Sequence, residues 1–492
     1  MIPARLGAWK LSALLAGIAA FALLFGLEGP LHHLPGRGSR PALAAGVTAL
    51  MAIWWLSEAL PIHWTACVPL LVYPFSDVFA TSRLENAQRV LLPYFDSYIF
   101  LFFGGMCIAA AMQQWNLHRR IALAIMRAIG TDPRRLLLGL LVATAFVSLW
   151  ISNTATATMM LPIGLSLIAQ LETHAGGRRL EHYGASLMLA VAYASNVGGI
   201  GTKIGTAPNA QFASFMAQRG VEISFLEYMA IGLPFVALFL PLVWFVLWRT
   251  GRRDAPDAAA GRDVLRAEIA HLGRMRPGEA VVLGVFLCAA GLWIAGRPLT
   301  GWLAPRVGFI ALSSARVEAG IAMTAACVLM LLRIHGRRVL EIGSLRHLHI
   351  GTLLLLGGSL AMASAIEASG LSAWLAGQLA ALREAPAWAQ LLLASLATVA
   401  LSAVASNVAT IAVMLSVLES SVAPRIATTA LFTATVAASC DFALPAGTPP
   451  NAIVFSSGYV SVPRMAKTGA LLDLAGALLA AALCAWLVPL VL

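Results

Sequence analysis

Long apolar stretches separated by short polar segments occupy the chain from about residue 8 to residue 490. About ten of these stretches reach the ~20 residues that a membrane-spanning helix needs. The stretches predict spans near residues 8–27, 41–60, 62–80, 96–114, 184–218, 226–248, 279–296 and 318–333, a span that begins at 353, a broken span around 441–451, and a last span at 466–490. We therefore expect an all-α polytopic membrane protein with about 11 spans in one integral domain, 1–492.

Two further apolar segments do not fit simple spans. Segment 134–170 is interrupted by Ser152-Asn153-Thr154 and then by Pro162, and basic loops stand at both of its ends. A re-entrant hairpin fits this pattern, because irregular backbone at membrane depth must be buried in protein or line a wet cavity. A near-copy of the tripeptide in 386–420 predicts a second hairpin.

Spans 184–218 and 424–456 are each broken by a stretch rich in Gly and Pro, which cannot continue a helix comfortably. Three sequence pairs recur in the same order in the two halves: LFFGGMCIAAAM and LLLLGGSLAMASAI, ISNTATATMMLPI and ASNVATIAVMLSV, IGTAPNAQF and AGTPPNAIVF. The two copies start from opposite sides of the membrane. This predicts an inverted repeat, 96–220 and 350–460, of the kind found in secondary transporters.

Charge sets the orientation and excludes some functions. Only 11% of residues are charged, against about a quarter in soluble proteins, and the formal charge of +11 comes from Arg in short loops. This is the positive-inside pattern rather than a nucleic-acid surface, so we expect no nucleic-acid partner. The basic amphipathic segment 114–130 and the loop 249–276 then lie in the cytoplasm. The protein is expected to be a multi-pass protein of the plasma (inner) membrane with a cytoplasmic N-terminus.

The candidate chemistry is uncharged. Hydroxyl and amide groups at the interrupted segments, together with freed carbonyls and helix amino ends, can coordinate a small cation or hydrogen-bond an anion. The same residue types also hold membrane helices together, but their duplication favours a site built twice. We find no metal-ligand spacing and no nucleophile–base pair, so neither an enzyme nor a cofactor is expected.

At these residues the chain resembles the divalent anion sodium symporter family, whose members move dicarboxylates, tricarboxylates or sulfate. The resemblance rests on the paired tripeptides, on GGIGT with a following GTAPN, on WLSEALP and on SCDFALPAGTPPNAIVF, and it covers nearly the whole chain. It implies a homodimer in the lipid bilayer whose hairpins and broken helices carry the substrate by an elevator-like movement. The scaffold would be formed by 1–95, 226–335 and 466–492.

The resemblance also implies two sodium sites and one anion site. The first sodium site would use Ser148, Ser152, Asn153 and carbonyls around Gly201. The second would use Ser402, Ala405, Asn407 and carbonyls around Gly447. The anion would contact Ser152, Asn153, Thr154, Thr206, Pro208, Ser406, Asn407, Val408, Thr448 and Pro449.

Three residues need separate interpretations. Val408 stands where the family usually has Thr, and Lys203 stands in the first broken helix where an uncharged residue is expected. Lys203 could act as a fixed cation that replaces sodium, or it could lie away from the ligand. Asp441, beside the second break, could balance cations or relay protons, although pairing with a polar neighbour is the favoured interpretation.

The predicted function is secondary active transport of divalent organic anions, di- or tricarboxylates, coupled to sodium. One alternative is a sodium-independent anion exchanger that uses Lys203 as a fixed cation. An alternative from another class is an anion channel, because hairpins and broken helices also build channels. Dicarboxylates, citrate and sulfate would all suit a neutral hydrogen-bonding site.

Overall fold

The computed structural model describes residues 8–307 and 312–492, which are almost entirely helical. The strands of this part are β1 (Arg333–Ile334) and β2 (Arg337–Arg338), which pair antiparallel. Eight helical segments of the described residues are long and apolar enough to cross a membrane. They are α1 (Ala8–Gly26), Arg83–Gln114 with its last helix α6 (Ser97–Gln114), α9 (Asn153–His174), α12 (Phe225–Gly251), α14 (Pro277–Ile294), α16 (Ser314–Leu331), α17 (Ile350–Ser369) and α24 (Val462–Val491). The predicted class, an all-α polytopic membrane protein, is confirmed.

The third predicted span, 62–80, is not continuous. It consists of α3 (Ile62–Thr65), α4 (Val68–Val72) and the 3₁₀ turn η2 (Tyr73–Phe75). Pro69 and Pro74 each remove a backbone donor and fix φ, which explains why an apolar sequence of sufficient length does not form one helix here.

The shorter helices complete the chain. They are α2 (Arg40–Leu56), α5 (Arg83–Leu91), α7 (Leu117–Ile129), α13 (Ala258–Leu272), α15 (Gly296–Val307), α18 (Leu371–Gln378) and α19 (Ala380–Glu384), with the 3₁₀ turns η1 (Pro30–His32), η3 (Leu92–Phe95), η4 (Ile342–His347) and η5 (Pro424–Ile426). Helix α13 lies in the segment interpreted from the sequence as a cytoplasmic loop. Its Glu268 forms an ion pair with Arg119 of α7, so the two amphipathic helices are joined.

Each interrupted segment forms two antiparallel helices around a short turn. Helices α8 (Pro133–Ser148) and α9 occupy 134–170, and α20 (Ala387–Ser402) and α21 (Asn407–Ser421) occupy 386–420. Ser152 and Ser406 are the N-cap residues of the second helices. The Ser406 side chain accepts a free backbone amide, the bond for which Ser is favoured at this position, whereas the Ser152 side chain makes no such bond. Whether either hairpin re-enters a membrane stays a prediction.

The two broken helices have the same construction. The first consists of α10 (Glu181–Gly199) and α11 (Ala207–Gln218), and the second of α22 (Ala427–Ala438) and α23 (Pro449–Phe455). We call residues 200–206 the first break and residues 439–448 the second break. Pro lies in the first turn of both α11 and α23, where its missing amide hydrogen costs no helical hydrogen bond.

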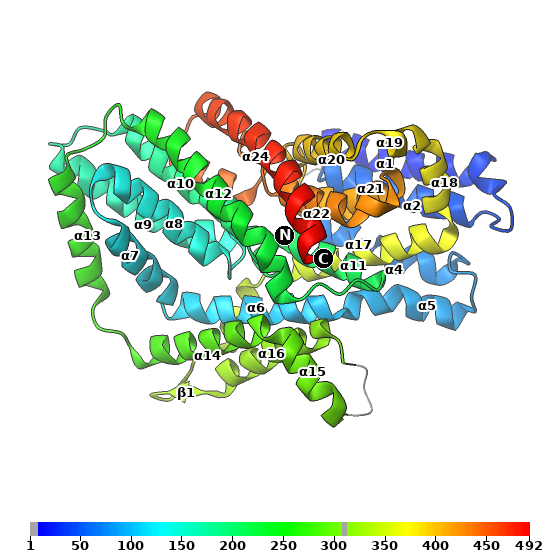
Figure 1. The fold of residues 1–492 in the computed structure, drawn as a ribbon, viewed down its shortest axis with the longest axis horizontal. Helices are drawn as coiled ribbons and strands as arrows, with labels where there is room; N and C mark the ends of the chain where they lie inside the picture. Colours follow the sequence, from blue (N-terminus) through cyan, green and yellow to red (C-terminus); the bar gives the residue numbers. More distant parts are fainter. Residues whose placement is uncertain (1–7, 308–311) are drawn as a thin grey trace.

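The hairpins and broken helices interlock. Helices α8 and α9 pack on α10, and α20 and α21 pack on α22. The second half of each broken helix crosses to the other hairpin: α23 contacts α9, and α11 contacts α21. In Figure 1, α8, α9 and α10 lie on the left, α20 and α21 lie on the right, and α12 and α24 run between them. Most apolar residues of these helices belong to one core.

The remaining long helices form two other apolar cores. Helices α6, α14 and α16 pack together along the lower edge of the view in Figure 1. Helices α2 and α17 form the third core. The turns at the hairpin tips lie where these cores meet the first one, and that junction is where the candidate site is found.

Candidate functional site

The first hairpin tip forms a cluster of oxygen atoms. The Ser148 hydroxyl donates to the carbonyl oxygen of Ser195 at 2.6 Å and lies 3.1 Å from Oδ1 of Asn153. The same end of the Asn153 amide is 3.0 Å from the Ser195 carbonyl oxygen and 3.3 Å from the Gly205 carbonyl oxygen. If the amide oxygen faces this cluster, four oxygens converge, a set of ligands that a small cation could draw together, although the opposite orientation satisfies the hydrogen bonds of the amide. If the amide nitrogen faces it, the nitrogen donates to them instead.

The second hairpin tip repeats these contacts. The Ser402 hydroxyl lies 2.8 Å from Oδ1 of Asn407 and 2.8 Å from the carbonyl oxygen of Ala438, and its one proton can be donated to either. In both tips a serine near the end of one helix contacts an asparagine at the start of the next, five residues later. Each hairpin therefore presents a hydroxyl and an amide to a carbonyl of its own broken helix.

An asparagine fixes the shape of the first break. Nδ2 of Asn209 donates to the carbonyl oxygens of Gly199, at 2.8 Å, and Thr202, at 2.7 Å. These two bonds satisfy carbonyls that lost their helical partners where α10 ends. The Cα of Gly199 also lies close to the tip. A Cβ on this residue would lie 2.1 Å from Oδ1 of Asn153. Only glycine fits at this position.

The second break is fixed in the same way. Nδ2 of Asn451 donates to the carbonyl oxygens of Asp441, at 3.2 Å, and Leu444, at 2.9 Å. The two acceptors lie ten and seven residues before the asparagine, as they do in the first break. Both asparagines belong to the repeated sequences IGTAPNAQF and AGTPPNAIVF, but their role could not be predicted from the sequence.

Asn196 connects the two sites. Its Nδ2 donates to Thr448 Oγ1 at 3.0 Å and to the Asp441 carbonyl oxygen at 3.3 Å. Its Oδ1 lies 3.5 Å from the outer end of the Asn153 amide, which donates to it when the amide oxygen faces the first cluster. Asn196 was not predicted from the sequence. The one feature that could have indicated its role is its position just before the Gly-rich first break.

Gly201 lies between the residues whose carbonyls approach the first tip. These carbonyls belong to Ser195 and Gly205. The Cα of Gly201 itself faces the side chains of Leu149 and Leu233. Coordination of sodium by carbonyls around Gly201 stays a prediction.

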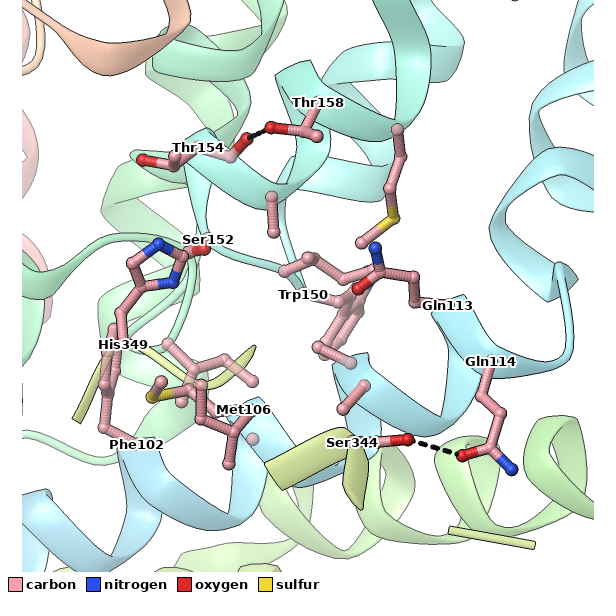
Figure 2. Close-up of a pocket in the computed structure, with 18 residues that line it drawn as sticks. Phe102, Met106, Gln113, Gln114, Trp150, Ser152, Thr154, Thr158, Ser344 and His349 are labelled. Carbon is pink, nitrogen blue, oxygen red and sulfur yellow. Dashed lines mark hydrogen bonds between the residues drawn. The ribbon is translucent and has the colours of Figure 1, made fainter. Parts of the chain in front are cut away.

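A cavity of about 500 Å³ opens beside the first tip (Figure 2). Ser152 and Thr154 line it, together with Trp150 and His349. Among its described lining residues none is Asp, Glu, Lys or Arg, and His349 is the one that can carry a charge. Helix α9 begins at Asn153, so the positive end of its dipole lies at this tip. Neutral donors and a helix amino end are suited to an anion that must bind reversibly.

The other predicted anion contacts lie outside the lining of this cavity. Thr206 and Thr448 are the N-cap residues of α11 and α23, followed by Pro208 and Pro449 in their first turns. Ser406 caps α21 by accepting the backbone amide of Ala409. Val408 is half-buried and packs against the cores of α6, α14 and α16 and of α2 and α17. Of the predicted anion contacts, Ser152 and Thr154 are the two that line the cavity.

Lys203 does not line the cavity. It is fully buried, and its Nζ donates to Oε2 of Glu318 in α16 at 2.7 Å. Nζ also lies 5.2 Å from the ring centre of Tyr98, while Glu318 accepts the backbone amide of Phe225 at 2.8 Å. The charge of Lys203 is therefore compensated by Glu318. In the part of the chain that the structure describes, no contact supports the alternative in which Lys203 faces the anion.

Comparison with known proteins agrees with this arrangement. A family model described as the sodium:sulfate symporter transmembrane region matches residues 10–492. The sodium-dependent dicarboxylate transporter SdcS of Staphylococcus saprophyticus is 35% identical, over 97% of this chain and 92% of that protein. SdcS of Staphylococcus aureus is 33% identical over the same shares.

Among solved structures, MtrF of Neisseria gonorrhoeae, described as illuminating a class of antimetabolite efflux pumps, matches with a TM-score of 0.53. The match covers 99% of this chain and 95% of that chain at 13% identity, so it concerns the fold alone. The family match spans nearly the whole chain, including both hairpins and both breaks. The chain belongs to the sodium:sulfate symporter family, a family of membrane transporters and not of enzymes.

Proposed function

We propose that the protein is a secondary active transporter that moves divalent organic anions, di- or tricarboxylates, together with sodium. The observation that carries the proposal is the pair of matched Ser–Asn clusters, one of which adjoins a cavity lined by neutral donors. The names of the relatives, sodium-dependent dicarboxylate transporters, support the same ions and substrate class.

Electrostatics explains why sodium and the anion would travel together. Removing a dianion from water is costly when only neutral groups replace the water. A sodium ion about 4 Å away attracts each unit of negative charge by ~4 kcal/mol at an effective dielectric of about 20. Sodium held by the tip clusters would therefore make the neutral cavity able to bind a dicarboxylate.

The proposed movement is elevator-like. The hairpins and broken helices share one apolar core, which would let them move as a unit. Helices α6, α14 and α16, with α2 and α17, have separate cores and would form the fixed scaffold. Helices α12 and α24 belong to the same core as the hairpins, so we assign them to the moving unit. The resemblance had placed them in the scaffold, within 226–335 and 466–492. We propose a homodimer in the inner membrane with a cytoplasmic N-terminus.

The two alternatives have less support. A sodium-independent exchanger would need the Lys203 charge at the anion, but this charge is paired with Glu318. An anion channel would need a continuous path, whereas the cavity reaches only the first tip among the described residues.

Uptake into proteoliposomes tests the proposal. We expect labelled succinate to accumulate with an inward sodium gradient and not with an equal gradient of choline, and to show saturable counterflow. Citrate and sulfate, tested in the same way, define the anion class. Uptake without sodium dependence would support the exchanger, and flux without counterflow or saturation would support the channel. Either result would overturn the proposal.

A further inference from the structure

The second break contains a buried carboxylate that has no hydrogen-bond partner. The Asp441 side chain is fully buried, and neither of its carboxylate oxygens has a partner among the described residues. The pairing with a polar neighbour that the sequence favoured is therefore not observed. An ionised carboxylate without a partner in a protein interior is strongly unfavourable, so this group calls for a ligand.

The internal repeat shows where this carboxylate lies relative to the site. Asn209 bonds to the carbonyl of Gly199 as Asn451 bonds to the carbonyl of Asp441, ten residues earlier in each case. Asp441 is thus the counterpart of Gly199, whose Cα approaches the tip amide of the first hairpin. The second break carries a carboxylate at the position where the first break has no side chain.

The Asp441 carboxylate points along the break toward Gly447. A Cβ on Gly447 would lie 2.1 Å from Oδ2 and 2.5 Å from Oδ1 of Asp441. Gly447 is the counterpart of Gly205, since both lie four residues before the asparagine of their break. The carbonyl of Gly205 takes part in the first oxygen cluster. If Gly447 takes the place in the second cluster that Gly205 has in the first, the Asp441 carboxylate lies at the edge of the second cluster.

We propose that Asp441 is a carboxylate ligand of the cation bound at the second break, so that this site carries a fixed negative charge that the first site lacks. This inference rests on the proposed sodium coupling. Carboxylate, hydroxyl, amide and carbonyl oxygens are the ligands that hard cations such as sodium prefer. The two sites would therefore differ in affinity, and the second would fill at the lower sodium concentration.

A neighbouring carboxylate offers a control. Oδ1 of Asp473, in α24, accepts the backbone amide of Phe442 at 2.7 Å. Asp473 is therefore held by the backbone, and an asparagine could keep this bond through its own Oδ1. Asp441 differs because the described structure gives its carboxylate no such bond.

Sodium-dependent thermal stability of the purified protein in detergent tests the proposal without transport. The wild type, Asp441→Asn and Asp441→Ala are titrated with sodium chloride, with choline chloride keeping the ionic strength constant. Ligands that bind only the folded state raise its stability with concentration, so the half-saturating sodium concentration reports affinity. We expect Asp441→Asn to raise this concentration by about tenfold or more, and Asp441→Ala at least as much. In choline alone both variants should be as stable as the wild type or more so, because the unpaired charge has been removed.

For the control variant Asp473→Asn, the half-saturating sodium concentration should stay within about threefold of the wild-type value. If Asp441→Asn responds to sodium as the wild type does, or is less stable to the same extent in both salts, Asp441 is a structural residue and the proposal fails. If the wild type itself gains no stability from sodium, the proposed sodium coupling fails and this inference fails with it. Sodium titration of uptake in proteoliposomes gives the same comparison should either variant be too unstable in detergent.

Discussion

Asn153 and Asn407 each place an amide at the start of a helix, in contact with a serine hydroxyl five residues earlier. An amide offers both a carbonyl oxygen for a cation and an NH₂ group for an anion. Helix amino ends at the same places add positive potential. At the scale of the residue, the site therefore depends on groups that can serve both ions at once.

Removing either amide should abolish transport. We expect Asn153→Ala and Asn407→Ala each to lose sodium-dependent uptake while eluting as folded protein, because each removes an oxygen from one cluster. Uptake of labelled succinate into proteoliposomes measures the effect. Thr173→Ala, an exposed position on α9 away from the tip, is the control and should retain activity. A fully active Asn→Ala variant would show that its tip is not part of the site.

The hydroxyl of Thr154 should contribute to anion affinity. Thr154→Val keeps the shape of the side chain and removes one donor from the cavity. A hydrogen bond is worth about 0.5–1.5 kcal/mol net, so the half-saturating succinate concentration should rise about two- to twelvefold. The control is Thr158→Val. Thr158 lines the same cavity, but its hydroxyl already donates to the Thr154 carbonyl oxygen at 2.8 Å and is not free to bind the anion. Equal effects of the two variants would mean that the Thr154 hydroxyl has no special contact with the anion.

The sequence identified many residues of this region but not how they are arranged. Paired Ser and Asn residues were recognisable because polar groups are conspicuous in an apolar segment and occur twice. Asn196 could not be singled out, because its importance comes from contacts with residues more than 240 positions away. Val408 packs between two apolar cores, which the sequence could not show, and its contact with the anion stays a prediction.

At the scale of the element, the buried pair Lys203–Glu318 joins the first break to α16. It connects two apolar cores, and both side chains are fully buried. Removing one partner of a buried pair leaves an uncompensated charge, which costs about 3–5 kcal/mol, whereas replacing both partners is often nearly neutral. This asymmetry makes the role of the pair testable.

Lys203→Met and Glu318→Gln should each lower the apparent unfolding temperature in detergent, by an amount that corresponds to about 3–5 kcal/mol. The double variant should recover most of this loss. An exposed pair is the comparison: Arg89→Met, which removes the partner of Glu85 one turn away, should cost under about 0.5 kcal/mol. If the two single losses add in the double variant, the residues act independently and the pair is not what holds the break to α16.

Element boundaries could be predicted where local sequence decides them. The hairpin helices lie within a few residues of 134–170 and 386–420, because Ser caps and basic flanks are local signals. Helix α13 was missed because tertiary contacts cover it: Val264 and Leu265 are buried in the first core, and Glu268 accepts from Ser166 of α9. Similarly, nothing local indicated that Lys203 would find Glu318, 115 residues later.

At the scale of the whole molecule, the repeat predicts that the two halves have equivalent parts, and the contacts agree in detail. Each hairpin packs on its own broken helix and contacts the second half of the other one. This exchange brings the first tip and the second break together at Asn196. Sequence similarity between the halves revealed the parts, but their interlocking follows from packing across the molecule.

The orientation of the chain in the membrane is the remaining property that the fold and the arginine distribution jointly predict. Single cysteines at Arg262, exposed on α13, and at Ser313, just before α16, are separated by α14, which is long enough to span a bilayer. With the exposed Cys288 and Cys327 replaced by Ser, we expect a membrane-impermeant maleimide to label Arg262→Cys only in inside-out vesicles. Ser313→Cys should be labelled only in right-side-out vesicles.

The physical reason is the positive-inside rule, under which the Arg-rich segment around α13 stays in the cytoplasm. Its Glu268 also holds the basic helix α7 on that same side through Arg119. Because α7 precedes the first hairpin, the side of α7 also sets the side from which the predicted re-entrant hairpin would start. Labelling of both cysteines from one side would mean that α14 does not cross the membrane. Reversed labelling would keep the inverted repeat but exchange the sides from which the two tips are reached.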